Sequence, residues 1–141
     1  MCVPKSKKEF LMRVLIRSWV SSIQTYTYFE NGRYWCDEVA FAPEAVPFVW
    51  DNAELYTGLR DTENREIFEG DVVSCLFERD SGALPLTGEV MFEDGKFVIV
   101  GDVAVQDEDG AYTTVSTRAF DDYTLASCED MLVVGSKRGE R

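Results

Sequence analysis

The sequence predicts a mainly β fold, or a β-rich α+β fold, on three observations. Aromatic residues make up 13% of the 141-residue chain, and aromatic side chains are enriched in strands. Short runs that alternate apolar and polar residues recur along the chain, as in half-buried strands. Residue pairs that favour tight turns, at 31–32, 94–95 and 109–110, separate several of these runs. We therefore expect a compact, barrel-like set of roughly eight antiparallel strands with short hairpins and little helix.

The first segment, MRVLIRSWV at residues 12–20, fits two kinds of element. Its apolar spacing is compatible with a helix, whereas its β-branched content and interspersed polar residues fit a strand. In the strand, Val14, Ile16 and Val20 would point toward the core. The local pattern leaves both alternatives open.

The following segment, TYTYFENGRYWCDEVAF, is predicted as a hairpin. Two aromatic runs flank Asn31 and Gly32, and both residues of an Asn-Gly pair tolerate the positive φ that a two-residue hairpin turn requires. Pro43 and Pro47 then favour a loop that holds at most one helical turn.

A polar turn is expected at residues 60–64, after an extended stretch that begins at Leu55. Asn64 is the residue expected in a left-handed conformation, and Gly70 supplies a positive φ before the strand 71–77. The segment lacks the lysine, the additional glycines and the following helix of a phosphate-binding loop. We therefore interpret its glycines as requirements of backbone geometry.

Two further hairpins turn at residues 94–95 and 109–110. The first has four candidate core residues, which are Val90, Phe92, Phe97 and Ile99. The acidic residues of the second lack the glutamate spacing of a calcium-binding EF-hand loop, so we interpret them as an exposed turn. One late helix or helical turn, with Asp121 as its N-cap, is expected before a closing strand at 131–135.

The cysteine and histidine content argues against a metal site. The four cysteines lie far apart with no Cys-x-x-Cys pair, and the chain has no histidine, so we expect neither zinc nor another cofactor. We find no secretory signal and no apolar run of the roughly 18 residues that span a bilayer. Reduced thiols, a cytoplasmic location and no membrane contact are therefore expected.

Charge is unevenly distributed along the chain, whose net charge is −12. Residues 21–136 hold 6 positive and 24 negative side chains, a net of −18, while basic residues gather at both ends. Such a body repels phosphate backbones, so direct nucleic-acid binding is not expected. An acidic surface of this kind either keeps the protein soluble or binds a protein with a basic surface. The candidate acidic interaction surface consists of Asp107, Glu108, Asp109, Asp121 and Asp122.

No catalytic motif accompanies this charge pattern. The chain has no nucleophile elbow, phosphate-binding loop or dinucleotide fingerprint, so we assign no catalytic residue and expect a non-enzymatic protein that binds another protein. The alternatives are a self-assembling structural protein and a binder of a small molecule such as a nucleotide. A homo-oligomer is favoured by the aromatic hairpin, which has apolar side chains on both faces of its strands. Its residues are Tyr26, Tyr28, Tyr34 and Trp35.

The stretch LYTGLRDTENREIFEGDVV, at residues 55–73, resembles the signature of the YopX family of phage and prophage proteins. A tyrosine-threonine-glycine-leucine element, a charged turn and a glutamate-glycine-aspartate step follow one another in this order. Residues 12–19 and 131–136 resemble the opening and closing strands of the family. The signature residues, to which we assign a structural role, are Tyr56, Thr57, Gly58, Leu59, Asp61, Glu69, Gly70 and Asp71.

The resemblance implies a compact β-rich fold of barrel-like character, a bacterial host and no established catalytic residues. It places one domain at residues 12–136, between a flexible basic extension at 1–11 and a basic tail at 137–141. Together with the charge, it predicts a phage or prophage accessory protein that binds a host or phage protein. One departure concerns the charged turn, where Asn64 is followed by Arg65 although the family usually has Asn-Gly.

Deletion of residues 1–11 should leave the folded domain nearly as stable as the full chain. These residues precede the segment that resembles the opening strand and follow no structural pattern. Thermal unfolding of both chains, followed by circular dichroism, should show melting temperatures within about 8 °C of each other, or roughly 2 kcal/mol at this size. A larger drop in the truncated chain would mean that the segment packs against the domain.

Overall fold

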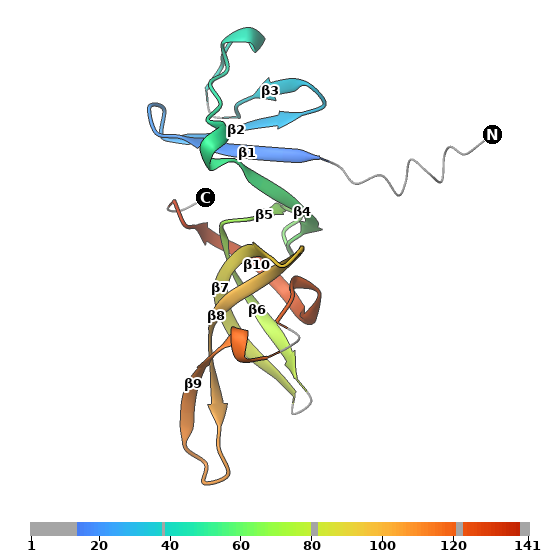
Figure 1. The fold of residues 1–141 in the computed structure, drawn as a ribbon, viewed down its shortest axis with the longest axis vertical. Helices are drawn as coiled ribbons and strands as arrows, with labels where there is room; N and C mark the ends of the chain where they lie inside the picture. The colour runs from blue at the N-terminus through green and yellow to red at the C-terminus, as the bar shows by residue number, and fades with distance from the viewer. Residues whose placement is uncertain (1–13, 38, 80–81, 121–122, 139–141) are drawn as a thin grey trace, which may run out of the picture. The chain divides into compact units, whose positions relative to one another are not determined.

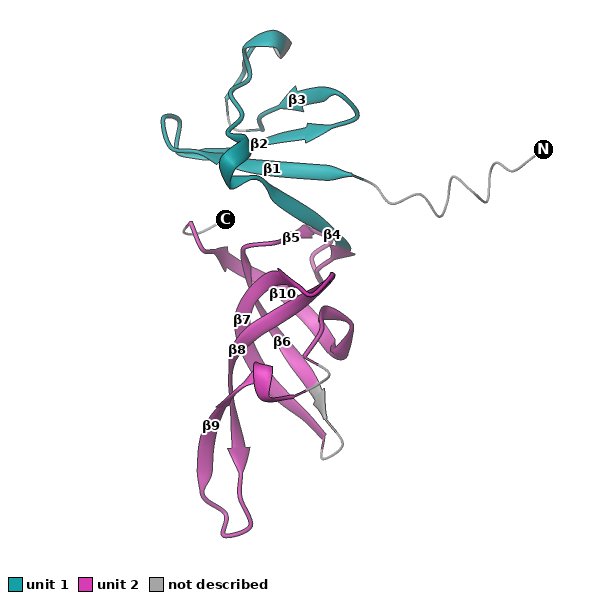
Figure 2. Cartoon of the chain, in the orientation of Figure 1, with its two compact units in different colours: residues 1–58 teal, residues 59–141 magenta. Residues whose placement is uncertain are grey.

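A computed structural model describes residues 14–37, 39–79, 82–120 and 123–138. Over these residues the chain forms ten β-strands and four short 3₁₀ helices (Figure 1). The expected mainly β fold with little helix is therefore confirmed. The chain divides into two compact units, residues 1–58 and residues 59–141 (Figure 2). The single domain expected at residues 12–136 stays a prediction, and residues 1–11 lie outside the described part.

The first unit contains the strands that precede the signature, and β4 continues past its boundary. Its elements are β1 (Leu15–Val20), β2 (Thr25–Glu30), β3 (Arg33–Trp35), η1 (Pro43–Ala45), η2 (Trp50–Asn52) and β4 (Glu54–Arg60). The second unit holds β5 (Glu66–Phe68), β6 (Asp71–Arg79), β7 (Gly82–Glu93), β8 (Lys96–Gln106), β9 (Tyr112–Ser116), η3 (Thr117–Ala119), η4 (Leu125–Ser127) and β10 (Cys128–Ser136).

The strands form two five-stranded sheets, in the orders β3-β2-β1-β4-β5 and β10-β6-β7-β8-β9. The pairings within them are antiparallel, as expected. The expected barrel-like character does not extend to a closed barrel, because both sheets are open over the described residues. A barrel in the second sheet would need β10 to pair with β9. The free side of β10 is instead hydrogen-bonded to the turn at residues 61–65.

The segment that fitted either a helix or a strand is the strand β1, and its expected facing is only partly correct. Val20 is buried as expected, whereas Val14 is 58% exposed and Ile16 is half-buried. Leu15 and Arg17, from the opposite face, are fully buried. The reason is an ion pair between the charged side chain of Arg17 and its partner on β4, which the apolar pattern of β1 does not reveal.

That ion pair joins Arg17 Nε to Glu54 Oε1 at 2.7 Å, with the two side chains 0% and 4% exposed. The two residues are opposite each other in the pairing of β1 with β4. The Arg17 guanidinium also lies 4.1 Å from the ring centroid of Tyr26, which allows a cation–π interaction. A buried charge needs such partners, because burying an isolated charge costs several kcal/mol.

The hairpins that the turn pairs predicted are all present. Asn31 and Gly32 have φ of 54° and 78° and join β2 to β3, where Glu30 pairs with Arg33. Residues 94–95 likewise have positive φ and join β7 to β8. The third turn, between β8 and β9, is longer than the two-residue type, because Asp107 N donates to Ala111 O at 2.8 Å.

The core of the second unit includes Val73, Cys75 and Phe77, which alternate along β6. Of the four candidates on the next hairpin, Val90 and Ile99 are fully buried, but Phe92 is 46% exposed and Phe97 is half-buried. The two phenylalanines pair across the strands near the turn and pack on each other, with ring centroids 4.9 Å apart. The buried core residues are Ile67, Val73, Cys75, Phe77, Leu86, Val90, Ile99, Val103, Leu125, Cys128 and Val133.

The late helix is represented by two single 3₁₀ turns, η3 and η4, in the described part of the chain. The expected N-cap, Asp121, lies outside the described residues. At η3 the cap is Ser116, whose Oγ accepts from the backbone N–H of Arg118 at 3.3 Å. No helix in the described ranges is long and apolar enough to cross a membrane.

Replacement of Gly70 by valine should destabilise the protein by about 1–3 kcal/mol, since Gly70 has a φ of 90° that side chains with a Cβ adopt only under strain. Glu63→Ala is the control, because the Glu63 side chain is 64% exposed and exposed substitutions change stability by about 0.5 kcal/mol or less. Urea unfolding of both variants measures the difference. Equal, small effects would show that the turn before β6 tolerates a side chain.

Candidate functional site

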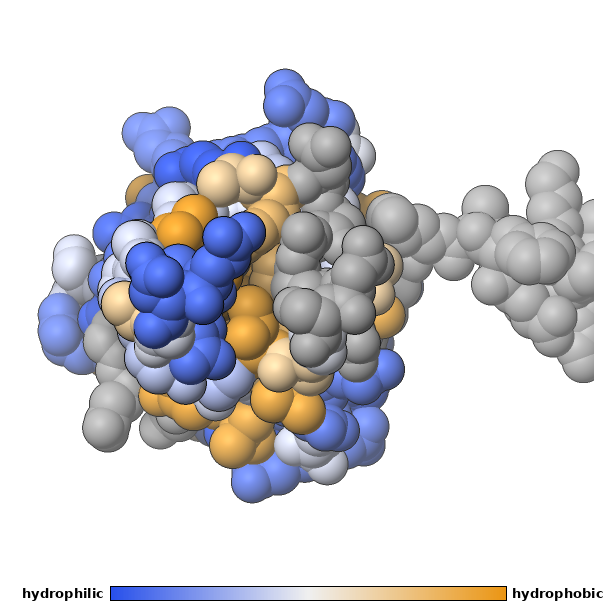
Figure 3. All heavy atoms as spheres, turned by 90° about the horizontal axis from the view of Figure 1, so that it is seen from below, coloured by the Kyte–Doolittle hydropathy of each residue, from blue (hydrophilic) through white to orange (hydrophobic). Residues whose placement is uncertain are grey.

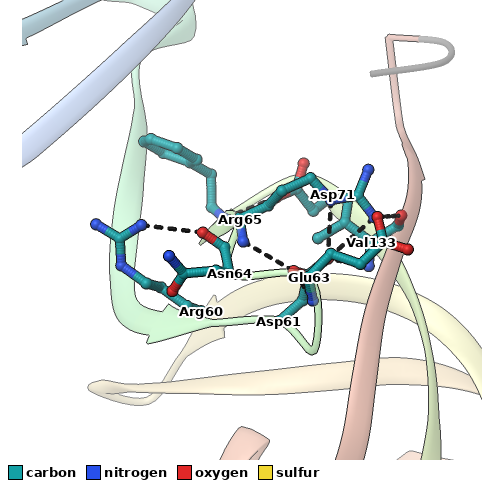
Figure 4. Close-up of polar contacts among 8 residues, drawn as sticks. Arg60, Asp61, Glu63, Asn64, Arg65, Asp71 and Val133 are labelled. Carbon is teal, nitrogen blue, oxygen red and sulfur yellow. Dashed lines mark hydrogen bonds and ion pairs between the residues drawn. The ribbon is translucent and has the colours of Figure 1, made fainter.

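The signature segment is organised by one buried carboxylate, that of Asp61 (Figure 4). Its Oδ1 accepts from the backbone N–H groups of Glu63 and Arg65, each at 2.9 Å. Its Oδ2 accepts from Val133 N at 2.9 Å and from Arg65 Nε at 3.0 Å. Asn64 has the expected left-handed conformation, with φ of 64°. Asp61 therefore fixes the charged turn and ties it to β10.

The same turn covers the outer edge of β10. Thr62 N donates to Met131 O at 2.8 Å, and Arg65 Nη2 donates to Val133 O at 2.7 Å. With the bond from Val133 N to Asp61, three backbone groups of β10 are thereby satisfied. An uncovered strand edge is a template for pairing with other chains. The turn at 61–65 acts as an edge cap in the place of a further strand.

A second buried carboxylate, that of Asp71, holds the turn before β6. Its Oδ2 accepts from Phe68 N at 2.7 Å, across the turn in which Gly70 has a φ of 90°. Gly70 N donates to Val90 O, and Lys137 N donates to Gly70 O. The turn formed by Glu69, Gly70 and Asp71 thus connects the start of β6 to β7 and to the residue that follows β10.

The remaining signature residues lie on β4 and beside Gly70. Tyr56 and Thr57 are each 9% exposed, Leu59 is 40% exposed and Glu69 is half-buried. Gly58 has a φ of 89°, which explains a glycine within the strand. These positions and contacts are those of packing and turn geometry, and the structural role assigned to the signature stays our interpretation.

Asp61 is held ionised by its contacts. Burial is the largest single influence and raises the pKa of this carboxyl. The hydrogen bonds from the backbone N–H groups of Val133, Arg65 and Glu63, with the charge of Arg65, outweigh it and lower the pKa below its ordinary value. The edge cap is therefore strongest when Asp61 is charged.

The candidate acidic surface lies in part on the β8–β9 hairpin. Asp107, Glu108 and Asp109 are exposed in its connecting turn, which projects beyond the other strands of its unit (Figure 1). Asp107 also shapes this turn, because its Oδ1 accepts from Asp109 N and Ala111 N at 2.9 Å each. Asp121 and Asp122 lie outside the described residues. Figure 3, which views the molecule from below, shows hydrophilic residues beside hydrophobic ones on this face.

Four arginines are paired with carboxylates, a feature that the sequence alone did not predict. Arg17 pairs with Glu54, Arg60 with Glu66, Arg65 with Asp61 and Arg118 with Glu93. The hydrogen bond from Arg118 lowers the pKa of Glu93. These four arginines therefore already have carboxylate partners within the chain.

Two other clusters were missed in the sequence because their members are far apart along the chain. Cys75 and Cys128 are buried free thiols, and a hydrogen bond with the Cys128 side chain lowers the pKa of Cys75 against the effect of burial. In the first unit, Phe48 packs its ring against those of Trp50, Tyr34 and Phe29, with centroids 4.6–6.3 Å apart. The alternation of apolar and polar residues along single strands predicts neither cluster.

The aromatic hairpin expected to self-associate has its rings paired within the chain. Tyr28 stacks on Trp35 with centroids 5.6 Å apart, and Tyr26 packs edge-on against Trp19 at 5.1 Å. Tyr26 is buried, while Tyr28 and Trp35 are half-buried. Self-association through this hairpin stays a prediction. Within the described ranges, no three acidic, cysteine or histidine side chains gather in a group that could hold a metal ion.

Comparison with protein families identifies a match over most of the chain. The model of the YopX family, described as YopX protein, matches residues 17–136, which is most of the chain. The matched region includes the edge cap, the buried carboxylates of Asp61 and Asp71, and β10. No curated protein and no solved structure matches the chain.

Replacement of Asp61 by asparagine should destabilise the protein by about 2–4 kcal/mol at pH 7, because hydrogen bonds to the ionised carboxylate are lost or weakened. Because folding lowers the pKa of Asp61, its ionised carboxylate stabilises the folded protein at pH values above the ordinary aspartate pKa of about 3.9. This contribution disappears as the pH falls through the folded-state pKa. The difference between wild type and Asp61→Asn should therefore shrink below about pH 4.

Chemical denaturation at a series of pH values measures this difference. Asp109→Asn is the matched control, because its side chain is exposed in a turn, and it should have little effect at any of these pH values. A pH-independent loss in Asp61→Asn would show that packing, and not the charge of Asp61, carries the stabilisation.

Proposed function

This chain belongs to the YopX family, and from that premise we propose that it acts by stoichiometric binding of a host or phage protein that has a basic surface. The observation that carries the proposal is the arrangement of charge on the β8–β9 hairpin. Residues 100–116 contain four carboxylates and no lysine or arginine. All four, which are Asp102, Asp107, Glu108 and Asp109, are exposed.

The charge of the rest of the molecule reinforces this local field. Arg60, Arg65 and Arg118 are held in ion pairs, while acidic residues such as Asp94 and Asp130 are exposed. An excess of one sign of charge steers the encounter with an oppositely charged partner and raises the association rate. The same excess disfavours nucleic acids and anionic membrane surfaces, which carry negative charge.

Binding without catalysis is the mode of action that we propose. The two best-defined buried carboxylates, Asp61 and Asp71, accept hydrogen bonds from the backbone and so support turns. The proposed setting is the cytoplasm of a bacterial host, for which the free thiols of Cys36, Cys75 and Cys128 are suited.

Neutralising the hairpin should reduce partner binding more than neutralising the same number of charges elsewhere. The hairpin variant combines Asp102→Asn, Glu108→Gln and Asp109→Asn and leaves Asp107 to hold the turn. The control variant combines Asp37→Asn, Glu44→Gln and Asp51→Asn, all at exposed positions of the first unit. Each protein is used as bait in host lysate at about 50 mM and about 300 mM salt, since a charge-steered complex weakens with screening.

We expect wild type and control to retain a stoichiometric partner at low salt, and the hairpin variant to retain about tenfold less, as loss of roughly 1.4 kcal/mol would give. Retention should fall in all three at high salt. If no protein is retained at low salt, the binding proposal is wrong. If both variants lose the partner equally, the hairpin has no special role.

A further inference from the structure

The two edges of the second sheet differ in their protection. At one end, the turn at 61–65 caps β10 with bonds to Met131 and Val133. At the other end, β9 pairs with β8 along its whole length, and no described residue pairs with its outer side. One edge of this sheet is closed and the other is open.

The hydrogen-bond pattern identifies which groups face outward from β9. The bond from Asp107 N to Ala111 O fixes the phase of the hairpin, and paired residues in an antiparallel ladder alternate between bonded and non-bonded. From the register of β8 with β9, Thr113 and Val115 direct their backbone groups toward β8. The backbone N–H and C=O groups of Tyr112, Thr114 and Ser116 therefore point to the open side.

The open strand lacks the features by which natural proteins protect an edge. The sequence Tyr-Thr-Thr-Val-Ser has no lysine, proline or glycine, and its β-branched and aromatic residues favour an extended chain. Positions 112, 113, 114 and 116 are exposed, and Tyr112 is 71% exposed. An edge of this kind can accept a further strand through its main chain.

Charge decides which strand fits. Pairing of β9 with its counterpart in a second copy would bring two hairpins together, each with four carboxylates and no basic residue, and like charges repel. We propose that the open edge of β9 binds an extended, basic segment of the partner protein by β-strand addition. This inference rests on the proposed function and specifies how the partner is held.

The two faces of the hairpin also predict the pattern of that segment. Asp102, Ala104 and Gln106 lie on the exposed face of β8, with Tyr112, Thr114 and Ser116 beside them on β9. The opposite face carries the buried or half-buried Val103, Val105 and Val115. A strand added to β9 places alternate side chains on the two faces. The bound segment therefore alternates basic residues, on the side of Asp102, with apolar residues.

The probe is a fluorescein-labelled peptide of eight residues that alternates lysine with valine, and its binding is measured by fluorescence anisotropy. Two further peptides are N-methylated, one at every lysine and the other at every valine. Only one of the two sets of peptide N–H groups faces β9 in a ladder. We expect the parent peptide to bind, and one methylated peptide to bind at least about tenfold more weakly than the other, since a backbone hydrogen bond contributes about 1 kcal/mol.

Two variants of the full chain test the protein side. Thr114→Pro removes an outward N–H and no bond to β8, whereas Thr114→Ala keeps that N–H at the same position. Binding should be weakened about tenfold or more by proline and little by alanine. Amide hydrogen exchange of the wild-type protein provides a readout that needs no variant. The amides of Tyr112, Thr114 and Ser116 should exchange fast alone and slowly with the parent peptide.

The outcomes distinguish β-strand addition at the edge of β9 from binding by the acidic surface alone. If the three peptides bind equally, or exchange at Thr114 is unchanged by the bound peptide, charge alone holds the segment and β-strand addition is wrong, while the proposed function stands. If no peptide binds at low salt although the lysate experiment retains a partner, the edge inference is also wrong. If neither experiment shows binding, both proposals fail. A dimer through β9 at low salt would overturn the choice of occupant.

Discussion

The second unit depends on the carboxylate of Asp61, which is 0% exposed as a side chain and accepts four hydrogen bonds. Two of them close the turn at 61–65, and one reaches the backbone of β10. An ionised group of this kind is costly to bury unless its acceptor sites are filled. Because neighbouring N–H groups fill them, the turn has one preferred conformation and β10 has a covered edge. The sheet therefore ends at β10, whose outer edge is covered by the turn and does not pair with a further described strand.

Local features of the fold could be predicted from the sequence, whereas features that join distant segments could not. The Asn31-Gly32 turn and the positive φ of Asn64 and Gly70 depend on residues close together in the chain. Short sequence patterns therefore predict them. The facing of β1 depends on a contact of Arg17 with a residue 37 positions away. Whether the strands close into a barrel could not be predicted either, because the contact of Asp61 with Val133, which covers the edge of β10, spans 72 positions.

The candidate site shows the same division. The acidic residues at 107–109 are adjacent in sequence, and their exposure in a turn was expected from their composition. The neutralisation of arginines by carboxylates, and the open side of β9, depend on pairing between strands, which the sequence does not specify directly. The exposed acidic turn was therefore accessible from composition, whereas the strand order was needed to identify the open edge of β9, at which we propose that a partner binds.

The long span of the edge cap has a consequence for the order of folding. Loop closure costs more entropy as the chain between two contacts lengthens, and non-local contacts slow folding. The hairpins β6–β7, β7–β8 and β8–β9 involve neighbouring strands and are expected to form before the 61–65 turn meets β10. During that interval the edge of β10 is uncovered as well as that of β9, so aggregation through β10 is expected during synthesis or refolding, although the native protein covers this edge.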